Sequence, residues 1–149
     1  AFRMMHGDAW FREIDLPFDI VQNGRDIGPR LRFLPHIPKQ WRRFVRRCVR
    51  QSRDSRFRDF TEVQAEIAKL PISPSWRCTL VGGDYRWECE RGLRVFRVTW
   101  TRHSERVHEW AAWNEPAGSG RRLSKGSSGG KVGKTAALKA LQELFSELL

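Results

Sequence analysis

Residues 93–101 read Leu-Arg-Val-Phe-Arg-Val-Thr-Trp-Thr, and this stretch decides the fold of the C-terminal half. Side chains alternate between the two faces of a β-strand, so Phe96, Val98 and Trp100 share one apolar face. The opposite face is mixed and includes Arg97. The alternation predicts a strand that packs one face against a core and leaves the other face more polar.

Neighbouring stretches extend this strand into a sheet. Alternating patterns predict strands at 76–81, 85–89 and 107–113, with tight turns at the glycines between them. The stretch 116–130 is rich in Gly and Ser and is expected to be a loop. Residues 134–149 place apolar side chains at helical spacing. We therefore expect an antiparallel sheet of three to four strands covered by a C-terminal helix.

The N-terminal half has helical patterns instead. A helix is expected from Pro38 to about Gln51, because five apolar residues fall on one stripe. These residues are Trp41, Phe44, Val45, Cys48 and Val49. A second helix is expected from Asp59 or Thr61 to Leu70, with Val63, Ile67 and Leu70 as its buried stripe. Glu62 follows Asp59 by three residues, as in a capping box.

Two prolines in the segment 71–75 separate the halves, because they end a helix and favour extended backbone. The expected architecture is α+β, with residues 1–72 forming a helical piece and residues 73–149 forming a small sheet-and-helix module.

Composition narrows the class of protein. The chain has 149 residues, a formal net charge of +11 and 40% hydrophobic residues, which excludes a disordered basic tail. No apolar run approaches the roughly 18 residues of a membrane helix. Three cysteines without a C-x-x-C pair argue against a disulfide scaffold and a zinc cluster. We expect a cytoplasmic protein with no cofactor and no membrane partner.

Basic residues crowd the first predicted helix on the faces away from its apolar stripe. They are Arg42, Arg43, Arg46, Arg47 and Arg50. Such a band can contact phosphates, or it can be a solvated helix face whose arginine stems cover the core. The second interpretation is favoured because exposed basic helix faces are common.

Residues 41–63 resemble the end of a protein kinase C-lobe. The resemblance rests on the run from Trp41 through Cys48-Val49 to Arg56, followed by Phe60-Thr61-Glu62-Val63. Kinases end with a helix carrying a Cys-Leu pair, a loop that is often Asp-Pro-x-x-Arg, and a last helix. Here Val49 replaces the Leu, Ser52-Arg53 replaces the Asp-Pro, and Arg56 falls on the family's arginine.

The same likeness extends upstream, so that it covers about residues 1–70. Residues 2–7 look like the end of the large central C-lobe helix, although the stretch 7–18 is longer than usual. The resemblance implies that Arg56 is a structural arginine whose partner is a glutamate in an activation segment before Ala1. We therefore expect a missing kinase-like segment upstream, or another protein, to be the partner.

The chain does not contain the motifs that a kinase needs for phosphoryl transfer. It has no kinase Gly-rich loop, ATP-binding lysine, His-Arg-Asp loop or Asp-Phe-Gly motif. This chain alone is therefore not expected to be an enzyme, whereas the parent protein could be a serine/threonine kinase. Residues 128–135 end in Gly-Lys-Thr and nearly match a P-loop, but no buried strand precedes them, which argues against nucleotide hydrolysis.

The segment 76–146 has a weaker resemblance to a double-stranded-RNA-binding domain. It rests on the predicted strands, a Ser-Lys loop and the run from Lys131 to Leu141. The resemblance implies that Lys125, Lys131 and Lys134 contact phosphates across a groove. Arg121 and Arg122 are further candidate anion contacts. The first helix of such an RNA-binding domain would have to be residues 59–70, which the kinase resemblance also uses.

Two functions are thus expected from the sequence. The first is a non-catalytic C-terminal portion of a serine/threonine protein-kinase-like protein, with a basic module for docking, regulation or RNA contact. The alternative is a stand-alone protein that binds double-stranded RNA or another nucleic acid. The remaining polar residues predict no catalytic or metal site, and His103 and His108 are expected on opposite faces of the sheet.

Overall fold

The computed structural model describes residues 22–23, 25–72 and 75–148. It divides into two compact units, Ala1–Ile72 and Ser73–Leu149, which are described separately below. The fold is α+β, because helices and an antiparallel sheet are both present. The expected end of a kinase central helix, at residues 2–7, lies outside the described residues.

Within residues 25–72, the N-terminal unit forms two α-helices and two short 3-10 turns. In chain order they are η1 (Gly28–Arg30), α3 (Lys39–Cys48), η2 (Arg53–Ser55) and α4 (Phe60–Ala68). Both expected α-helices are present, although α3 ends three residues before Gln51. Among the residues of this unit that the structure describes, the buried apolar side chains are those of Leu31, Phe33, Leu34, Ile37, Phe44 and Val45.

Helix α3 buries only part of its expected stripe. Phe44 and Val45 are buried, but Cys48 is exposed. Cys48 is the last residue of α3.

Helix α4 begins at a side-chain cap, as the sequence predicts. Asp59, not Thr61, is the N-cap, and its carboxylate accepts a hydrogen bond of 2.8 Å from the Glu62 N–H. The stripe expected to be buried is only partly covered: no residue of α4 is fully buried, and Ile67 is 43% exposed. Polar contacts at its N-terminus therefore contribute much of what holds this helix in place.

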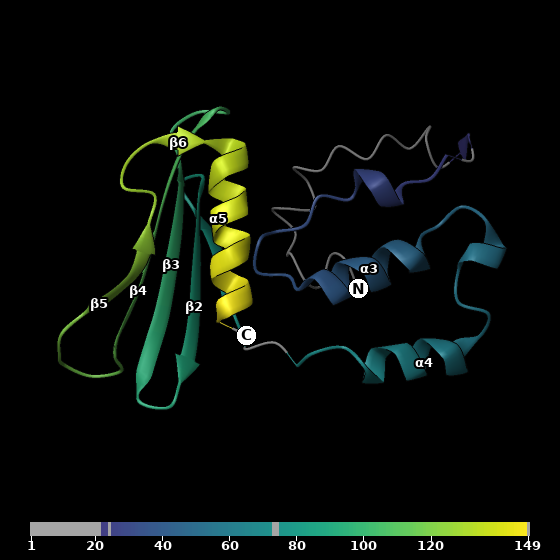
Figure 1. Ribbon diagram of the computed structural model, residues 1–149, viewed down its shortest axis with the longest axis horizontal. Helices are drawn as coiled ribbons and strands as arrows, with labels where there is room; N and C mark the ends of the chain where they lie inside the picture. The colour runs from purple at the N-terminus through teal and green to yellow at the C-terminus, as the bar shows by residue number, and fades with distance from the viewer. Residues whose placement is uncertain (1–21, 24, 73–74, 149) are drawn as a thin grey trace. The chain divides into compact units, whose positions relative to one another are not determined.

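The C-terminal unit is a six-stranded antiparallel sheet with one helix. The first three strands are β1 (Arg77–Val81), β2 (Asp84–Arg91) and β3 (Arg94–Arg102). They are followed by β4 (Val107–Pro116), β5 (Leu123–Ser127), β6 (Val132–Gly133) and helix α5 (Lys134–Glu147). The strands follow the order β1-β2-β3-β4-β5, and β6 also pairs with β4 (Figure 1).

The four strands expected from the sequence are all present, but the expectation of three to four strands was too low. Strand β5 lies inside the stretch 116–130 that was expected to be a loop. Its sequence, Leu-Ser-Lys-Gly-Ser, has a single apolar residue, so it carries no alternating pattern. It is a strand because its backbone pairs with β4, with Ala111 opposite Ser127 and Asn114 opposite Leu123.

Helix α5 covers the apolar face of the sheet, as Figure 1 shows. In the sheet register, Trp87 lies opposite Val98 and Val98 lies opposite Ala112, and all three are buried. The Phe145 ring of α5 meets the Trp87 ring edge-on, with centroids 5.4 Å apart. The opposite face of the sheet is polar and holds Arg97, as the alternation in residues 93–101 predicts.

Candidate functional site

A cavity of about 360 Å³ lies between α3 and α4 in the N-terminal unit. Five cationic residues and one acidic residue line it. They are Arg43, Arg46, Arg47, Arg50 and Lys69, with Glu66 as the acid. Its volume is within the range of about 300–1,000 Å³ that is typical of small-molecule sites.

Two polar contacts hold the helices on either side of this cavity. The Trp41 indole N–H, near the start of α3, donates to the Pro71 carbonyl, which follows α4, at 3.1 Å. The Arg47 guanidinium, near the end of α3, pairs with Glu62 in the first turn of α4 at 2.6 Å. The antiparallel helices are thus fixed at both ends, and the cavity between them is preformed.

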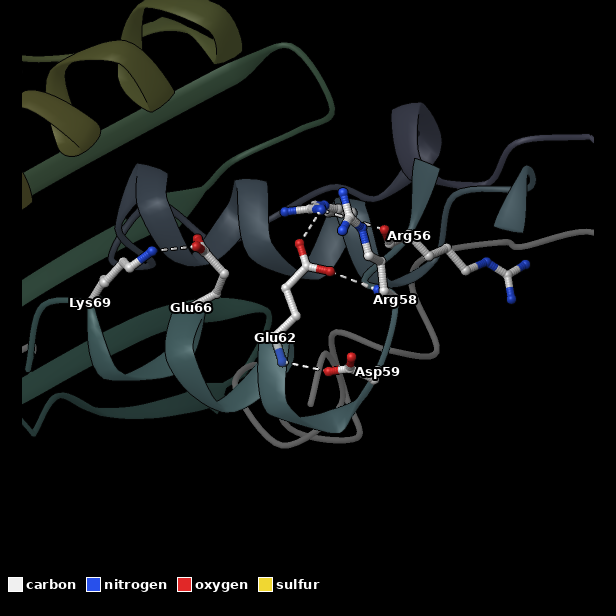
Figure 2. A network of polar contacts seen from close by, with 7 residues as sticks. Arg56, Arg58, Asp59, Glu62, Glu66 and Lys69 are labelled. Atoms are coloured by element: carbon white, nitrogen blue, oxygen red, sulfur yellow. Dashed lines mark hydrogen bonds and ion pairs between the residues drawn. The ribbon is translucent and has the colours of Figure 1, made fainter. Parts of the chain in front are cut away.

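Glu62 is the centre of the polar network at the start of α4 (Figure 2). Its carboxylate accepts the Arg58 backbone N–H at 2.7 Å, in addition to pairing with Arg47. The Arg58 N–H, with the Arg47 guanidinium as a smaller cause, lowers the pKa of the Glu62 carboxyl below its ordinary value. The network therefore needs Glu62 in its charged form.

Three arginines of α3 have structural roles. Arg42 donates to the carbonyls of Ile37 and Pro35, at 2.6 Å and 3.0 Å, and burial lowers the pKa of its guanidinium. Arg46 lies over the Phe33 ring, 5.1 Å from its centroid. Arg47 pairs with Glu62, as described above. The exposed Arg46, which lies over Phe33, fits the interpretation of a solvated face whose arginine stems cover the core, whereas Arg42 and Arg47 are held by specific polar partners.

Arg56, the expected structural arginine, closes the loop after α3. Its guanidinium donates to the carbonyls of Arg50 and Gln51, the second at 3.2 Å. These contacts link η2 to the end of α3 and set the direction in which the chain enters α4. Arg56 is itself exposed.

The expected phosphate contacts of the C-terminal unit lie along one edge of β4. Lys131 and Lys134 flank the two residues of β6, and Lys125 lies in β5 beside a bulge opposite Ala112 and Trp113. All three lysines are exposed. Lys125 adjoins Gly126, which lies opposite Ala112, whereas Val132 of β6 lies opposite His108. These two positions are four residues, or roughly 13 Å, apart along β4. Only Lys131 and Lys134 lie together at the start of α5.

Arg121 and Arg122 precede β5, and both are exposed. The Arg122 guanidinium stacks on Trp113, 3.5 Å from the ring centroid. This contact lies on the sheet face away from α5, because Trp113 pairs opposite Arg97. Arg122 is thus engaged by a tryptophan and is not grouped with the lysines at β6.

The segment that resembles a P-loop has a different local structure. Ser128 takes the place of a strand residue beside Trp110: its N–H donates to the Trp110 carbonyl at 2.9 Å, and its hydroxyl accepts the Trp110 N–H at 3.1 Å. Gly129 and Gly130 follow with positive φ. The loop therefore joins two strands that are antiparallel to β4, whereas a P-loop follows a buried strand of a parallel sheet.

His103 and His108 do not form a site together. His103 is exposed and pairs with Glu109 at 3.2 Å, whereas His108 is 1% exposed and its Nε2 lies 3.2 Å from the Glu105 carbonyl. Among residues 22–23, 25–72 and 75–148, no three His, Cys, Asp or Glu side chains are grouped as metal ligands.

Comparison of the chain with protein-family models, with curated proteins and with solved structures gave no match. Within the described part of the chain, each helix is too short or too polar to cross a membrane. Two arrangements of described residues are candidate sites: the cavity between α3 and α4, and the basic edge at β6.

Proposed function

We propose that this chain is the non-catalytic C-terminal portion of a serine/threonine protein-kinase-like protein, with the sheet-and-helix unit as an appended binding module. The observation that carries the proposal is the arrangement α3–η2–α4, in which Arg56 closes the turn between the two helices. For residues 38–70, the resemblance to a kinase C-lobe implies a helix, a short loop with an arginine and a last helix.

The geometry of Arg56 is compatible with the role that the resemblance gives it. Two of its nitrogens hold the carbonyls at the end of α3, yet the residue is exposed. A carboxylate from a preceding segment can therefore still reach the guanidinium, and Arg–carboxylate pairs are often bidentate. In the proposal, this pair joins the N-terminal unit to the kinase-like segment that precedes it.

The coding sequence upstream of Ala1 tests this proposal most directly. We expect it to encode a His-Arg-Asp loop and an Asp-Phe-Gly motif in the same reading frame. A start codon close to Ala1, with no such motifs before it, would refute the proposal. If the motifs are present, Arg56→Ala in the longer protein should weaken its phosphotransferase activity. The matched control is Arg53→Ala, which removes an exposed arginine three positions before Arg56.

A second candidate function, contact with double-stranded RNA, is favoured by the position of Lys131 and Lys134. Both are exposed at the start of α5, whose first turn contains no acidic residue and whose N-cap, Gly133, offers no side-chain acceptor. Backbone N–H groups and two cations thus face the same region, an arrangement that attracts phosphate oxygens.

Titration of the chain with duplex RNA at two salt concentrations tests this second function. The Lys131→Ala/Lys134→Ala variant should bind more weakly and with a salt dependence reduced by about two phosphate contacts. The control is Arg86→Ala/Lys139→Ala, which removes the same charge from exposed positions of the same unit. Equal affinities and salt slopes in the two variants would reject the lysines as contacts.

A further inference from the structure

We propose that the cavity between α3 and α4 binds a phosphomonoester, with the phosphate between Arg43 and Arg50 and the organic group against Phe44 and Phe57. The inference does not depend on the kinase-like assignment, because it uses only the lining of this cavity.

Within the described part of the chain, three guanidinium groups of the lining have no acidic partner. One of them, Arg46, is engaged by the Phe33 ring and the Leu31 carbonyl, and the other two are Arg43 and Arg50. Lys69 pairs with Glu66 at 2.6 Å, and Arg47 pairs with Glu62. The side chains of Arg43 and Arg50 make no ion pair or hydrogen bond within the described part of the chain, and both residues are exposed. Arg43 and Arg50 therefore add two guanidinium groups without any contact among the described residues to the uncompensated charge of Arg46, and a ligand that fills the cavity should bring negative charge.

The spacing of these two arginines suits a single anion. They are seven residues apart, so they lie on the same face of α3, two turns and roughly 10 Å from each other along its axis. Long arginine side chains can close on one anion placed between them. A phosphomonoester carries about −1.5 to −2 charges at neutral pH, which balances two guanidinium groups, whereas a carboxylate balances one.

The apolar part of the lining predicts what the phosphate is attached to. Phe44 is 9% exposed, and its ring centroid lies 5.1 Å from that of the half-buried Phe57. Leu70 completes this apolar wall. A flat organic group gains free energy by covering such rings. The ligand class is thus a phosphate ester with an adjoining ring, such as a phosphorylated tyrosine side chain or a nucleoside monophosphate.

The cavity can bind such a ligand without rearrangement, because the Trp41–Pro71 and Arg47–Glu62 contacts already fix both helices. A preformed site avoids the entropic cost of ordering its walls when the ligand binds.

The experiment is a titration of the 149-residue chain with phenyl phosphate, followed by NMR of the backbone amides. We expect saturable shifts in residues 40–50 and 66–70. Phenol, which lacks the anion, and inorganic phosphate, which lacks the ring, should each bind more weakly by at least about fivefold. Adenosine monophosphate is then compared with phosphotyrosine to distinguish the two sources of the ester.

The variant Arg43→Gln/Arg50→Gln should weaken phenyl phosphate at least about tenfold, since hydrogen bonds to charged groups contribute strongly. Its matched control is Arg30→Gln/Arg53→Gln, which removes two exposed charges of the same unit outside the cavity and should retain the affinity. If the double variant does not fold, Arg50→Gln alone serves instead and should lose at least about threefold.

Three results would overturn the proposal. They are the absence of saturable shifts in residues 40–50 and 66–70, equal affinities for phenol and phenyl phosphate, and an equal loss of affinity in the cavity variant and its control. The last result would mean that the affinity for the anion depends on the overall charge of the unit and not on this cavity.

Discussion

Replacing Trp41 with Phe should loosen α4 from α3, because it removes the hydrogen bond that fixes one end of the cavity. The indole N–H donates to the Pro71 carbonyl at 3.1 Å, and the Phe ring preserves most of the edge-on contact with Phe44. A hydrogen bond of this kind contributes about 0.5–1.5 kcal/mol net. The free energy of detaching α4 should therefore fall by that amount.

Amide hydrogen exchange measures this change, since α4 opens locally before the whole unit unfolds. Because α4 has no fully buried residue and is held by polar contacts, its amides are expected to exchange by local opening of the helix and not by unfolding of the whole unit. Exchange of the amides in residues 63–69 should accelerate by a factor of roughly 2 to 13, which is 0.5–1.5 kcal/mol expressed as a rate ratio. Amides of β2 and β3, in the other unit, should not change.

The matched control is Trp113→Phe, the same chemical change at a tryptophan whose indole N–H is buried without a hydrogen-bond partner in the described part of the chain. It should leave exchange in α4 at the wild-type rate. Unchanged exchange in α4 of Trp41→Phe, or equal acceleration in both units, would refute the reasoning that the Trp41–Pro71 contact holds this helix.

Three further predictions concern the network, the core and the thiols. Glu62→Gln should speed amide exchange in α4 at pH 7. Because the folded pKa of Glu62 is lowered from 4.5, its carboxylate stabilises α4 above pH 4.5, and this stabilisation is lost as the pH falls through the folded pKa. A difference in exchange between variant and wild type that persists at pH 2 would contradict the network. Phe145→Ala should lower the free energy of unfolding of the C-terminal unit by about 3–5 kcal/mol and its melting temperature by at least about 12 °C, because Phe145 is 3% exposed and its ring meets Trp87. Phe145→Leu should lower the free energy of unfolding by less than half as much. Equal losses of the two variants in calorimetry would show that ring packing is not the cause. Burial raises the pKa of Cys78 to about 12, so iodoacetamide at pH 8 should alkylate the exposed Cys48 first, and equal labelling of both in peptide mass spectra would contradict this.

The sequence predicted the elements with strong patterns and missed those held by backbone pairing. The strand at 93–101 and helix α5 carry apolar residues at periods of two and of about 3.6, so both were located to within a few residues. Strands β5 and β6 have no such pattern, because they lie on the edge of β4 and bury few side chains. Both strands pair with β4 through their backbones, and between them the Ser128 hydroxyl accepts the Trp110 N–H. A side-chain pattern in the sequence does not indicate such backbone pairing.

The candidate site was predictable only in part, for a similar reason. The band of arginines on α3 was visible, but its division into structural and free residues depends on segments distant in sequence. Arg46 meets Phe33, 13 positions earlier, and Arg47 meets Glu62, 15 positions later. Helical periodicity describes only which residues share a face. It does not identify the residues from other segments that those side chains meet.

The pairing of these arginines with other residues changes what the net charge of +11 implies for ligand binding. A formal charge counts every guanidinium equally, and by that count the molecule is uniformly basic. Arg42, however, is hydrogen-bonded to two carbonyls, and Arg47 is neutralised by Glu62. A buried or paired cation attracts an approaching anion far less than an unpaired one at the same distance, because its field is already compensated. The attraction that can select a ligand comes from the cations left unpaired in a shaped site. Among the described residues of the N-terminal unit, the cations beside a cavity without an acidic partner are Arg43, Arg50 and the Phe33-stacked Arg46.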